Sequence, residues 1–555
     1  MKHINKPVVL SLLLLSATAM VQAQDTTRKR SVEITSAFKP VLRESAKINF
    51  NATPPQPDTT KPVLQYNVPN QHLLFDYQPG ALTPLALQHD TAGVWNSSNY
   101  IKAGFGTLKT PYVQAGFSFG DGSTAGAEIF AKYTSSNGKR EYQQNANAQA
   151  RVTAFYKTAK DLEWSGGVGF KADRLYKYGY QPETLSFPKD SLRQQFNTFS
   201  GRIMLRNLRE TNFALSYAPE LKIDVFSDHL KNSESNTVLN LPLEKNINSD
   251  FAVNLALAFD MTRLSRDKQK AINNTIFYVA PGITYKSEKF LAQVGIRPSW
   301  DNSEFKMFPN ILAEYALADK QFVVHGGWTG HMRKTSYQSL AAQNPWIWAP
   351  GELRNTWVEE VFGGIKGTLV DHFIYSAKVG VNKLHNQQLF INDTAIVGGM
   401  PSDGKSFRIV NQDNMNVIVM GGELGYTVEE RFSATAGITL NQFTKLKGNN
   451  AKAWGMLPME MNANIRAQII KDLWLKVDMF GWDGAHFVRP DGSSTKLKGA
   501  FDLNAGLEFK VWNNISLWTQ FNNITNQEYQ RWNQYPVYGF NFVGGIVYSF
   551  DKKNK

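Results

Sequence analysis

The chain ends on a strand whose two faces differ in polarity, and this feature most constrains its fold. In residues 540–550 every even position, from Phe540 to Phe550, is apolar or glycine, and the odd positions from Asn541 to Ser549 are polar or small. Successive side chains of a strand point to opposite faces, so this strand separates two environments. In a soluble sandwich the apolar face would pack on a second sheet. In an outer-membrane barrel it would contact lipid, and the last strand would close onto the first.

Two earlier segments repeat the pattern over a length that suits a membrane. Residues 473–482 and 501–512 alternate apolar with polar or charged side chains for about ten residues. A tilted strand needs about that length to cross a bilayer, whereas soluble strands average about five to six residues. For the second segment the pattern predicts two faces, with Leu503, Leu507 and Phe509 toward lipid and Asn504, Glu508 and Lys510 toward the lumen.

Connections of two lengths separate the expected strands. The short ones are 121–124, 286–289, 318–321, 428–431, 471–472 and 512–514. The long polar ones are 173–191, 329–355, 385–405, 483–497 and 525–539. Outer-membrane barrels have tight periplasmic turns on one rim and longer extracellular loops on the other. The alternation of long and short connections across the second half therefore favours a barrel over a sandwich.

Composition narrows the fold class further. The 555 residues include no Cys, which excludes disulfides, thiolate metal sites and a Cys nucleophile. No apolar run near 20 residues follows the N-terminus, as a helical membrane protein would need. From Tyr100 to Phe550 we expect about 22 strands, an even number as bacterial barrels prefer, with 20 or 24 as alternatives. The predicted fold is all-β, a transmembrane antiparallel β-barrel over residues 98–555.

The N-terminal residues carry an export signal. Lys2 and Lys6 precede the apolar run 8–20, and a small-residue cleavage site follows at 21–23. Residues 1–23 are therefore predicted to be a signal peptide, and the mature protein is expected in the bacterial outer membrane. Residues 24–97 contain eight prolines and no sustained period, so we expect a short irregular periplasmic segment there.

The end of the chain and one central stretch resemble the TonB-dependent receptors. The last hairpin of that family reads Asn-Leu-Phe-(Asp/Asn)-x-x-Tyr, then a loop with Gly, then a strand with an aromatic end. The matching residues here are Asn522, Asn523, Ile524, Asn526, Tyr529, Gly539 and Phe550. A second family stretch, Asn-Pro-x-Leu-x-Pro-Glu…Glu-x-Gly, is matched by Asn344, Pro345, Pro350, Glu352, Glu359 and Gly363, with Gly351 as an extra residue. The resemblance covers roughly residues 98–550 and implies an outer-membrane transport barrel.

The resemblance fails at the N-terminal end. Family members fill the barrel with a globular plug, and residues 24–97 are too few and too rich in proline to form one. Residues 30–38, RSVEITSAF, weakly resemble a TonB box, the segment that pairs with a strand of TonB. Two functions remain open: a barrel that takes up or passes an unidentified solute, and a plugless scaffold or partner subunit of an envelope complex. The expected partners are outer-membrane lipid and either TonB or a periplasmic or surface lipoprotein.

Something must occupy a lumen this wide, because wall side chains alone cannot fill it. The candidates are the 24–97 segment, the loops 329–355 and 385–405 folded inward, and a separate protein. We expect residues 24–97 to lie at the periplasmic mouth and partly inside, without a core of their own.

No enzyme activity and no catalytic, cofactor or metal site is predicted. His325 and His331 flank GGWTG, but no further ligands lie nearby in the sequence. The net charge of +13 could suggest nucleic acid, but the export signal argues against it. Aromatic residues crowd two loops, and the simpler interpretation is an interfacial girdle, with a stacking surface for a ligand or partner as the alternative. They are Trp328, Tyr337, Trp346, Trp348, Trp357, Tyr529, Trp532, Tyr535 and Tyr538.

Overall fold

The computed structural model describes residues 99–550, except 181–185, 303, 319–320, 370–371, 394–395, 398–399, 402–403, 429–430, 449 and 490–492. The expected signal peptide, the 24–97 segment and its expected position, and residues 551–555 lie outside the described residues. No helix in the described part of the chain is long and apolar enough to cross a membrane.

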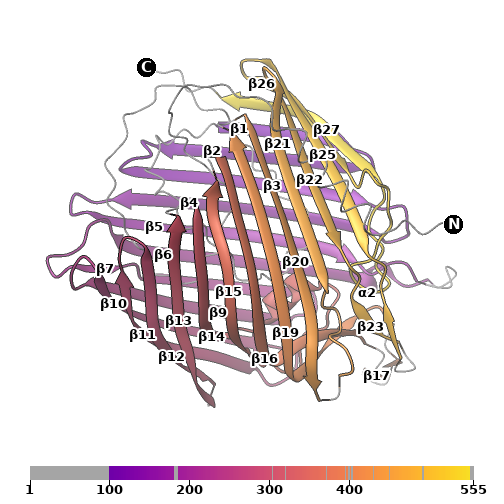
Figure 1. The fold of residues 1–555 in the computed structure, drawn as a ribbon. Helices are drawn as coiled ribbons and strands as arrows, with labels where there is room; N and C mark the ends of the chain where they lie inside the picture. The colour runs from indigo at the N-terminus through magenta and orange to yellow at the C-terminus, as the bar shows by residue number, and fades with distance from the viewer. Residues whose placement is uncertain are drawn as a thin grey trace, which may run out of the picture. The chain divides into compact units, whose positions relative to one another are not determined.

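The described strands form one closed antiparallel barrel (Figure 1). The sheet has 23 strands, but β7 and β8 are two pieces of one strand, interrupted at Ala218 and Pro219, so the barrel has 22 strand positions. Pairing of β1 with β27, from Asn99 opposite Phe550 to Gly106 opposite Val543, closes the barrel. The predicted fold class, strand number and seam are confirmed.

The first half of the barrel contains the following strands: β1 (Asn99–Gly106), β2 (Thr110–Gly120), β3 (Ala125–Asn137), β4 (Gln144–Lys157), β5 (Leu162–Tyr176), β6 (Arg193–Asn207), β7 (Leu215–Tyr217), β8 (Glu220–Asp228), β9 (Ser233–Asn246), β10 (Phe251–Ser265), β11 (Ile272–Lys286) and β12 (Phe290–Asp301). The second half contains β13 (Glu304–Ala318), β14 (Phe322–Arg333), β15 (Thr356–Leu369), β16 (Phe373–Asn392), β19 (Phe407–Val428), β20 (Phe432–Lys447), β21 (Met459–Ile470), β22 (Leu473–Trp482), β25 (Ala500–Trp512), β26 (Ile515–Asn522) and β27 (Asn541–Phe550).

The remaining elements lie in connections between barrel strands. They are the helices α2 (Lys189–Leu192) and α3 (Tyr337–Gln343), and two small hairpins made of β17 (Ile396–Val397) with β18 (Met400–Pro401) and β23 (His486–Val488) with β24 (Ser494–Lys496).

The connections divide the barrel ends into two rims. The turn rim carries 121–124, 158–161, 208–214, 247–250, 287–289, 319–321, 370–372, 429–431, 471–472 and 513–514. The loop rim carries all the long connections, including 177–192, 334–355, 393–406, 448–458, 483–499 and 523–540. By the rule for such barrels, the turn rim faces the periplasm and the loop rim faces outward. The six predicted short turns match the turn rim, but the loop rim also has three short connections, 107–109, 229–232 and 302–303.

The predicted loop 385–405 is wrong over about its first third. β16 continues to Asn392 and pairs there with β19, so the described loop is 393–406. These strands have 20 and 22 residues, far more than the roughly 9–11 that cross a bilayer. The alternation ends near His385 because this part of the hairpin stands beyond the membrane and has no lipid-facing side, so its residues read as loop.

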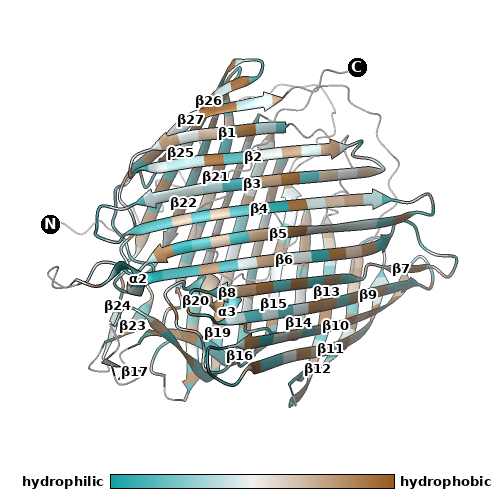
Figure 2. Cartoon of the chain, turned by 180° about the vertical axis from the view of Figure 1, so that it is seen from behind, coloured by the Kyte–Doolittle hydropathy of each residue, from teal (hydrophilic) through white to brown (hydrophobic). Residues whose placement is uncertain are grey.

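Inward and outward side chains follow the predicted register. On β27, Phe542, Ile546, Tyr548 and Phe550 are exposed outward and Val547 is fully buried. On β25, Leu507 and Phe509 are outward and exposed, while Asp502 and Asn504 are buried. Figure 2 shows the resulting alternation of hydrophobic and hydrophilic segments along the strands. Exposed apolar side chains occur on the outside of strands all round the barrel, which is the surface that an outer-membrane barrel presents to lipid.

Glycine allows the seam to close. Gly104 on β1 is paired with Gly545 on β27. A Cβ atom added to Gly545 would lie only 2.5 Å from the Cα atom of Gly104, and one added to Gly104 would lie 2.6 Å from the ring of Trp518. The two strands therefore approach closely where the inward wall is already filled by a tryptophan.

Substitution by arginine should distinguish the two faces of β20. Ile438 is exposed outward near the middle of the strand, and Thr435 is exposed on the inward face. We expect Ile438→Arg to lower the free energy of unfolding by about 2–4 kcal/mol, because the charge enters lipid, and Thr435→Arg to cost under about 1 kcal/mol. Urea titration in lipid vesicles measures both. Equal losses would contradict the register.

Candidate functional site: a lid built from loops

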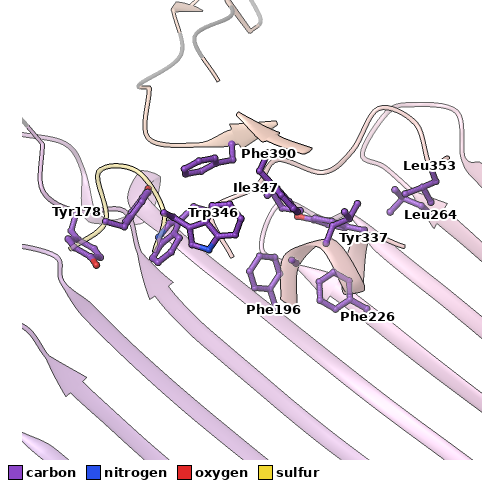
Figure 3. Close-up of a cluster of buried hydrophobic side chains, with 14 residues drawn as sticks. Tyr178, Phe196, Phe226, Leu264, Tyr337, Trp346, Ile347, Leu353 and Phe390 are labelled. Atoms are coloured by element: carbon purple, nitrogen blue, oxygen red, sulfur yellow. The ribbon is translucent and has the colours of Figure 1, made fainter. Parts of the chain in front are cut away.

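The described residues of four loops meet at the loop rim and form one buried cluster, which we call the lid. Loops 177–192, 334–355 and 523–540 and strand residues of the lumen wall supply its apolar side chains, and loop 393–406 joins it through Lys405. Figure 3 shows helix α3, which carries Tyr337, against the wall residues Phe196 and Phe226. The loops thus fold inward rather than extending away from the barrel.

Helix α3 is fastened to the wall by a buried carboxylate. Glu234 of β9 is 1% exposed, and its two oxygens accept the backbone N–H groups of Tyr337 at 2.6 Å and Gln338 at 3.0 Å. Both N–H groups belong to the first turn of the helix, where no intrahelical acceptor exists. Ser336 caps the same turn with its side chain, reciprocally with Ser339. The wall therefore supplies part of the capping that this short helix needs.

The side chain of Tyr337 inserts between two rings of the wall. Its ring meets Phe226 and Phe196 edge-on, with centroids 5.2 and 6.2 Å away, and its hydroxyl donates to Asp228 at 2.9 Å. Burial and the adjacent Asp228 carboxylate raise the pKa of Tyr337 well above its usual value. The hydroxyl consequently stays protonated and remains a donor.

The two ends of loop 334–355 are held by polar groups of neighbouring strands. Asn355 donates to Asn274 at 2.7 Å and to Asp301 at 2.6 Å, and Asn274 donates back to Asn355 and to the carbonyl of Thr335. At the other end Lys334 forms an ion pair with Asp260 at 3.0 Å. Burial lowers the pKa of Lys334, and the Asp260 carboxylate opposes that shift. Polar contacts at both ends thus fix where the loop enters and leaves the lid.

The last loop completes the lid from the opposite end of the chain. The rings of Trp346 and Tyr535 stack with centroids 3.8 Å apart. Lys405 donates to the carbonyl of Gly179 at 2.7 Å, and Tyr535 donates to the carbonyl of Lys405 at 2.9 Å. The hydroxyl of Tyr178 donates to the carbonyl of Pro536 at 2.7 Å. All four loops are therefore linked directly.

Four of the nine loop aromatics are neither a girdle nor an exposed stacking surface. Tyr337, Trp346, Trp532 and Tyr535 are buried inside the lid, whereas Trp328 is exposed on the outside of β14. Both interpretations from the sequence are therefore wrong for the buried residues. For Trp328, which faces outward, the girdle stays a prediction. The sequence could not tell a buried loop aromatic from one at the membrane surface, because both kinds stand among the same polar and small loop residues.

The residues that carried the family resemblance have structural roles at the loop rim. Asn523 has a φ of 47° and is buried, and its amide donates to the carbonyls of Gln527 and Tyr538 across the last loop. Tyr529 donates to Asp502 on the wall. In the central stretch, the fully buried Asn344 accepts the N–H of Trp346 at 3.1 Å. These residues position the lid.

The histidines singled out by the sequence lie on one strand. His325 and His331 are both part of β14. Among the described residues, no group of three or more His, Asp or Glu side chains gathers in a way that could hold a metal ion.

Comparison with known proteins places this fold. No family model matches the sequence, and no curated protein matches it. Solved structures do match: the FrpB iron transporter from Neisseria meningitidis has a TM-score of 0.62 at 9% identity, over 82% of this chain and 81% of that one. The siderophore receptor PirA from Acinetobacter baumannii has a TM-score of 0.62 at 10% identity, over 82% and 80%. The ferric-catecholate import receptor Fiu from K12 E. coli has a TM-score of 0.61 at 10% identity, over 82% of both chains.

At 9–10% identity these matches establish architecture. They agree with the strand number, the closure of β27 on β1 and the apolar outer surface. This chain is a closed antiparallel β-barrel of 22 strand positions with the fold of the TonB-dependent receptors.

Proposed function

We propose that the protein is an outer-membrane passage for a solute, closed on the loop side by its own lid. The observation that carries the proposal is how the lid is attached. Helix α3 and both ends of loop 334–355 are held to the wall by hydrogen bonds and one ion pair, and the loop also contributes buried side chains, Tyr337 among them, to the lid cluster. Each such contact contributes only about 0.5–3 kcal/mol, so a solute or partner that replaces several of them can release the loop.

The structural neighbours support transport. They are named as an iron transporter, a siderophore receptor and an import receptor. None of these names identifies the solute of this chain. We also propose that residues 30–38 couple the protein to TonB. An enzyme is not the expectation, since the neighbours in the comparison are transporters and receptors.

Conductance of deletion variants tests the passage. We expect a variant with residues 338–353 replaced by a short Gly-Ser linker to conduct strongly in planar bilayers, because the lid no longer covers the mouth. Deleting residues 30–90 tests whether the segment before the barrel also blocks the lumen. Combining the two deletions tests whether the lid and this segment block the same passage one after the other. A rise only in the double deletion would mean two barriers. No rise in any variant would contradict a lid-closed passage.

The alternative, a scaffold or partner subunit of an envelope complex, is favoured by one observation. The β16–β19 hairpin extends well beyond the length needed to cross a bilayer, and the β19 side of the extension exposes Arg408 and Asp413 to a partner outside the membrane. Affinity purification from native membranes discriminates between the two functions. A stoichiometric lipoprotein would favour the scaffold, and a lone protein with bound solute would favour transport.

A further inference from the structure

A recess opens in the lumen wall away from the lid. It has a volume of about 440 Å³ and spans β3 to β8 near their turn-rim ends. On β5, Trp164 and Val168 are exposed outward, so the alternating residues Ser165, Gly167 and Gly169 face the lumen. Its size falls in the range of small-molecule sites.

The floor of the recess is made of very small residues. Ser165, Gly167, Gly169 and Ser200 leave backbone and hydroxyl groups uncovered over two neighbouring strands. A Cβ atom on Gly167 would lie 2.7 Å from the carbonyl oxygen of Val152, so the backbone approaches closely there. This part of the wall is therefore hollow because its residues have small side chains or none.

Three cations from three strands line the hollow. They are Arg151 of β4, Arg202 of β6 and Lys222 of β8. Arg202 forms an ion pair with Glu220, and Lys222 pairs with Asp224 at 3.2 Å. The guanidinium of Arg151 lies 4.9 Å from the ring centroid of Phe130, and among the described residues it takes part in no ion pair. Glu128 of β3 also lies on the inward face, opposite Thr153, so three cations and three carboxylates balance and Arg151 is the cation without an ion pair among them.

We propose that the recess binds an anionic group, a carboxylate or a phosphate, with Arg151 as its main ligand. A guanidinium presents five N–H donors in a planar fork that suits two oxygens of one anion. Stacking on Phe130 restricts the orientation of that fork, and Ser165 and Ser200 add hydroxyl donors at the floor. Arg202 and Lys222 raise the local potential although they are already paired.

The anion has two possible sources. One is a solute in the lumen, in which case the recess gives the proposed passage a preference for acidic solutes, and this part rests on the proposed function. The other is an acidic side chain from residues 34–90, which contain Glu44, Asp58, Asp76 and Asp90. The chemistry of the site is the same in both cases.

Calorimetric titration of the purified full chain in detergent with inorganic pyrophosphate tests the site. We expect saturable binding that weakens with salt, at least tenfold weaker binding in Arg151→Gln and an intermediate loss in Arg151→Lys, which keeps the charge but loses the fork. Arg297→Gln is the matched control, because Arg297 also stacks on a ring, that of Tyr278, but lies on β12. It should bind like the unchanged protein.

The same titration on a chain lacking residues 30–90 separates the sources. Equal binding with and without these residues identifies a free solute site, and binding that appears only after deletion identifies the chain's own acids as the occupant. No binding in either chain, or the same affinity in Arg151→Gln, overturns the proposal. Heat-modifiable migration checks that each variant folds, and Lys222→Gln, which should also weaken binding, replaces Arg151→Gln if that variant fails. Because no transport is measured, failure of the proposed passage would leave this result standing.

Discussion

Glu234→Leu should detach helix α3 from the wall. The substitution removes the acceptor of two N–H groups in the first turn and leaves both donors without a protein partner in a buried position. Hydrogen bonds to a charged group contribute about 1.5–3 kcal/mol each, so we expect the free energy of local opening at α3 to fall by about 3 kcal/mol or more. Amide hydrogen exchange of residues 337–343 measures it directly.

Two control variants separate this effect from general damage. Glu234→Gln keeps one acceptor oxygen and should lose about half as much. Glu244→Leu changes another inward carboxylate on the same strand, far from the lid, and should leave exchange at α3 unchanged. Unchanged exchange in Glu234→Leu would mean that packing around Tyr337 holds the helix without the carboxylate.

Trp532→Ala should have a comparable or larger effect on the last loop. Trp532 is 3% exposed and packs edge-on against Phe390 and Phe407, with ring centroids 5.1 and 5.5 Å away. Gly455, whose φ is 77°, provides space for this ring, since a Cβ atom there would lie 3.0 Å from it. Truncating a buried tryptophan typically costs about 3–5 kcal/mol.

Limited proteolysis measures the result for the last loop. We expect trypsin to cleave after Arg531 in Trp532→Ala much faster than in the unchanged protein, because the loop leaves the cluster. Trp512→Ala is the control, because Trp512 is 65% exposed at the turn rim. Cleavage at the same rate in both variants would show that the lid does not depend on this ring.

The barrel was predictable because lipid imposes a strict period on each strand. Phe542 and Ile546 must face outward once Phe550 does. Because this two-faced strand is the last one, it was expected to pair with the first strand and close the barrel. The break between β7 and β8 was harder to foresee. Pro219 interrupts the hydrogen-bond ladder there, although the two pieces together still make one strand of the barrel. The outer part of the β16–β19 hairpin was not predicted, because a strand outside the membrane needs no apolar face and therefore shows no alternation.

The lid could not be derived from local pattern. Its contacts join residues that no periodicity relates, such as Trp346 with Tyr535 and Lys405 with Gly179. The recess is similar, because Arg151 and Lys222 lie 71 positions apart and become neighbours only through the arrangement of β4 to β8. Sequence reasoning identified the loops as candidates for filling the lumen, but it could not choose among them.

The last loop of the lid extends across the seam, and this constrains when its contacts can form during folding. Arg140 pairs with Glu528 at 2.6 Å, and Gln143 donates to the carbonyl of Pro536, so the last loop of the lid contacts the connection between β3 and β4, on the other side of the junction of β1 and β27. Contacts between residues nearly 400 positions apart carry a large entropic cost of loop closure and form late. They require both ends of the chain to be in place, in the correct register. The seam pairs residues even further apart, so these contacts form together with the seam or after it, and a barrel that closed out of register would lack them.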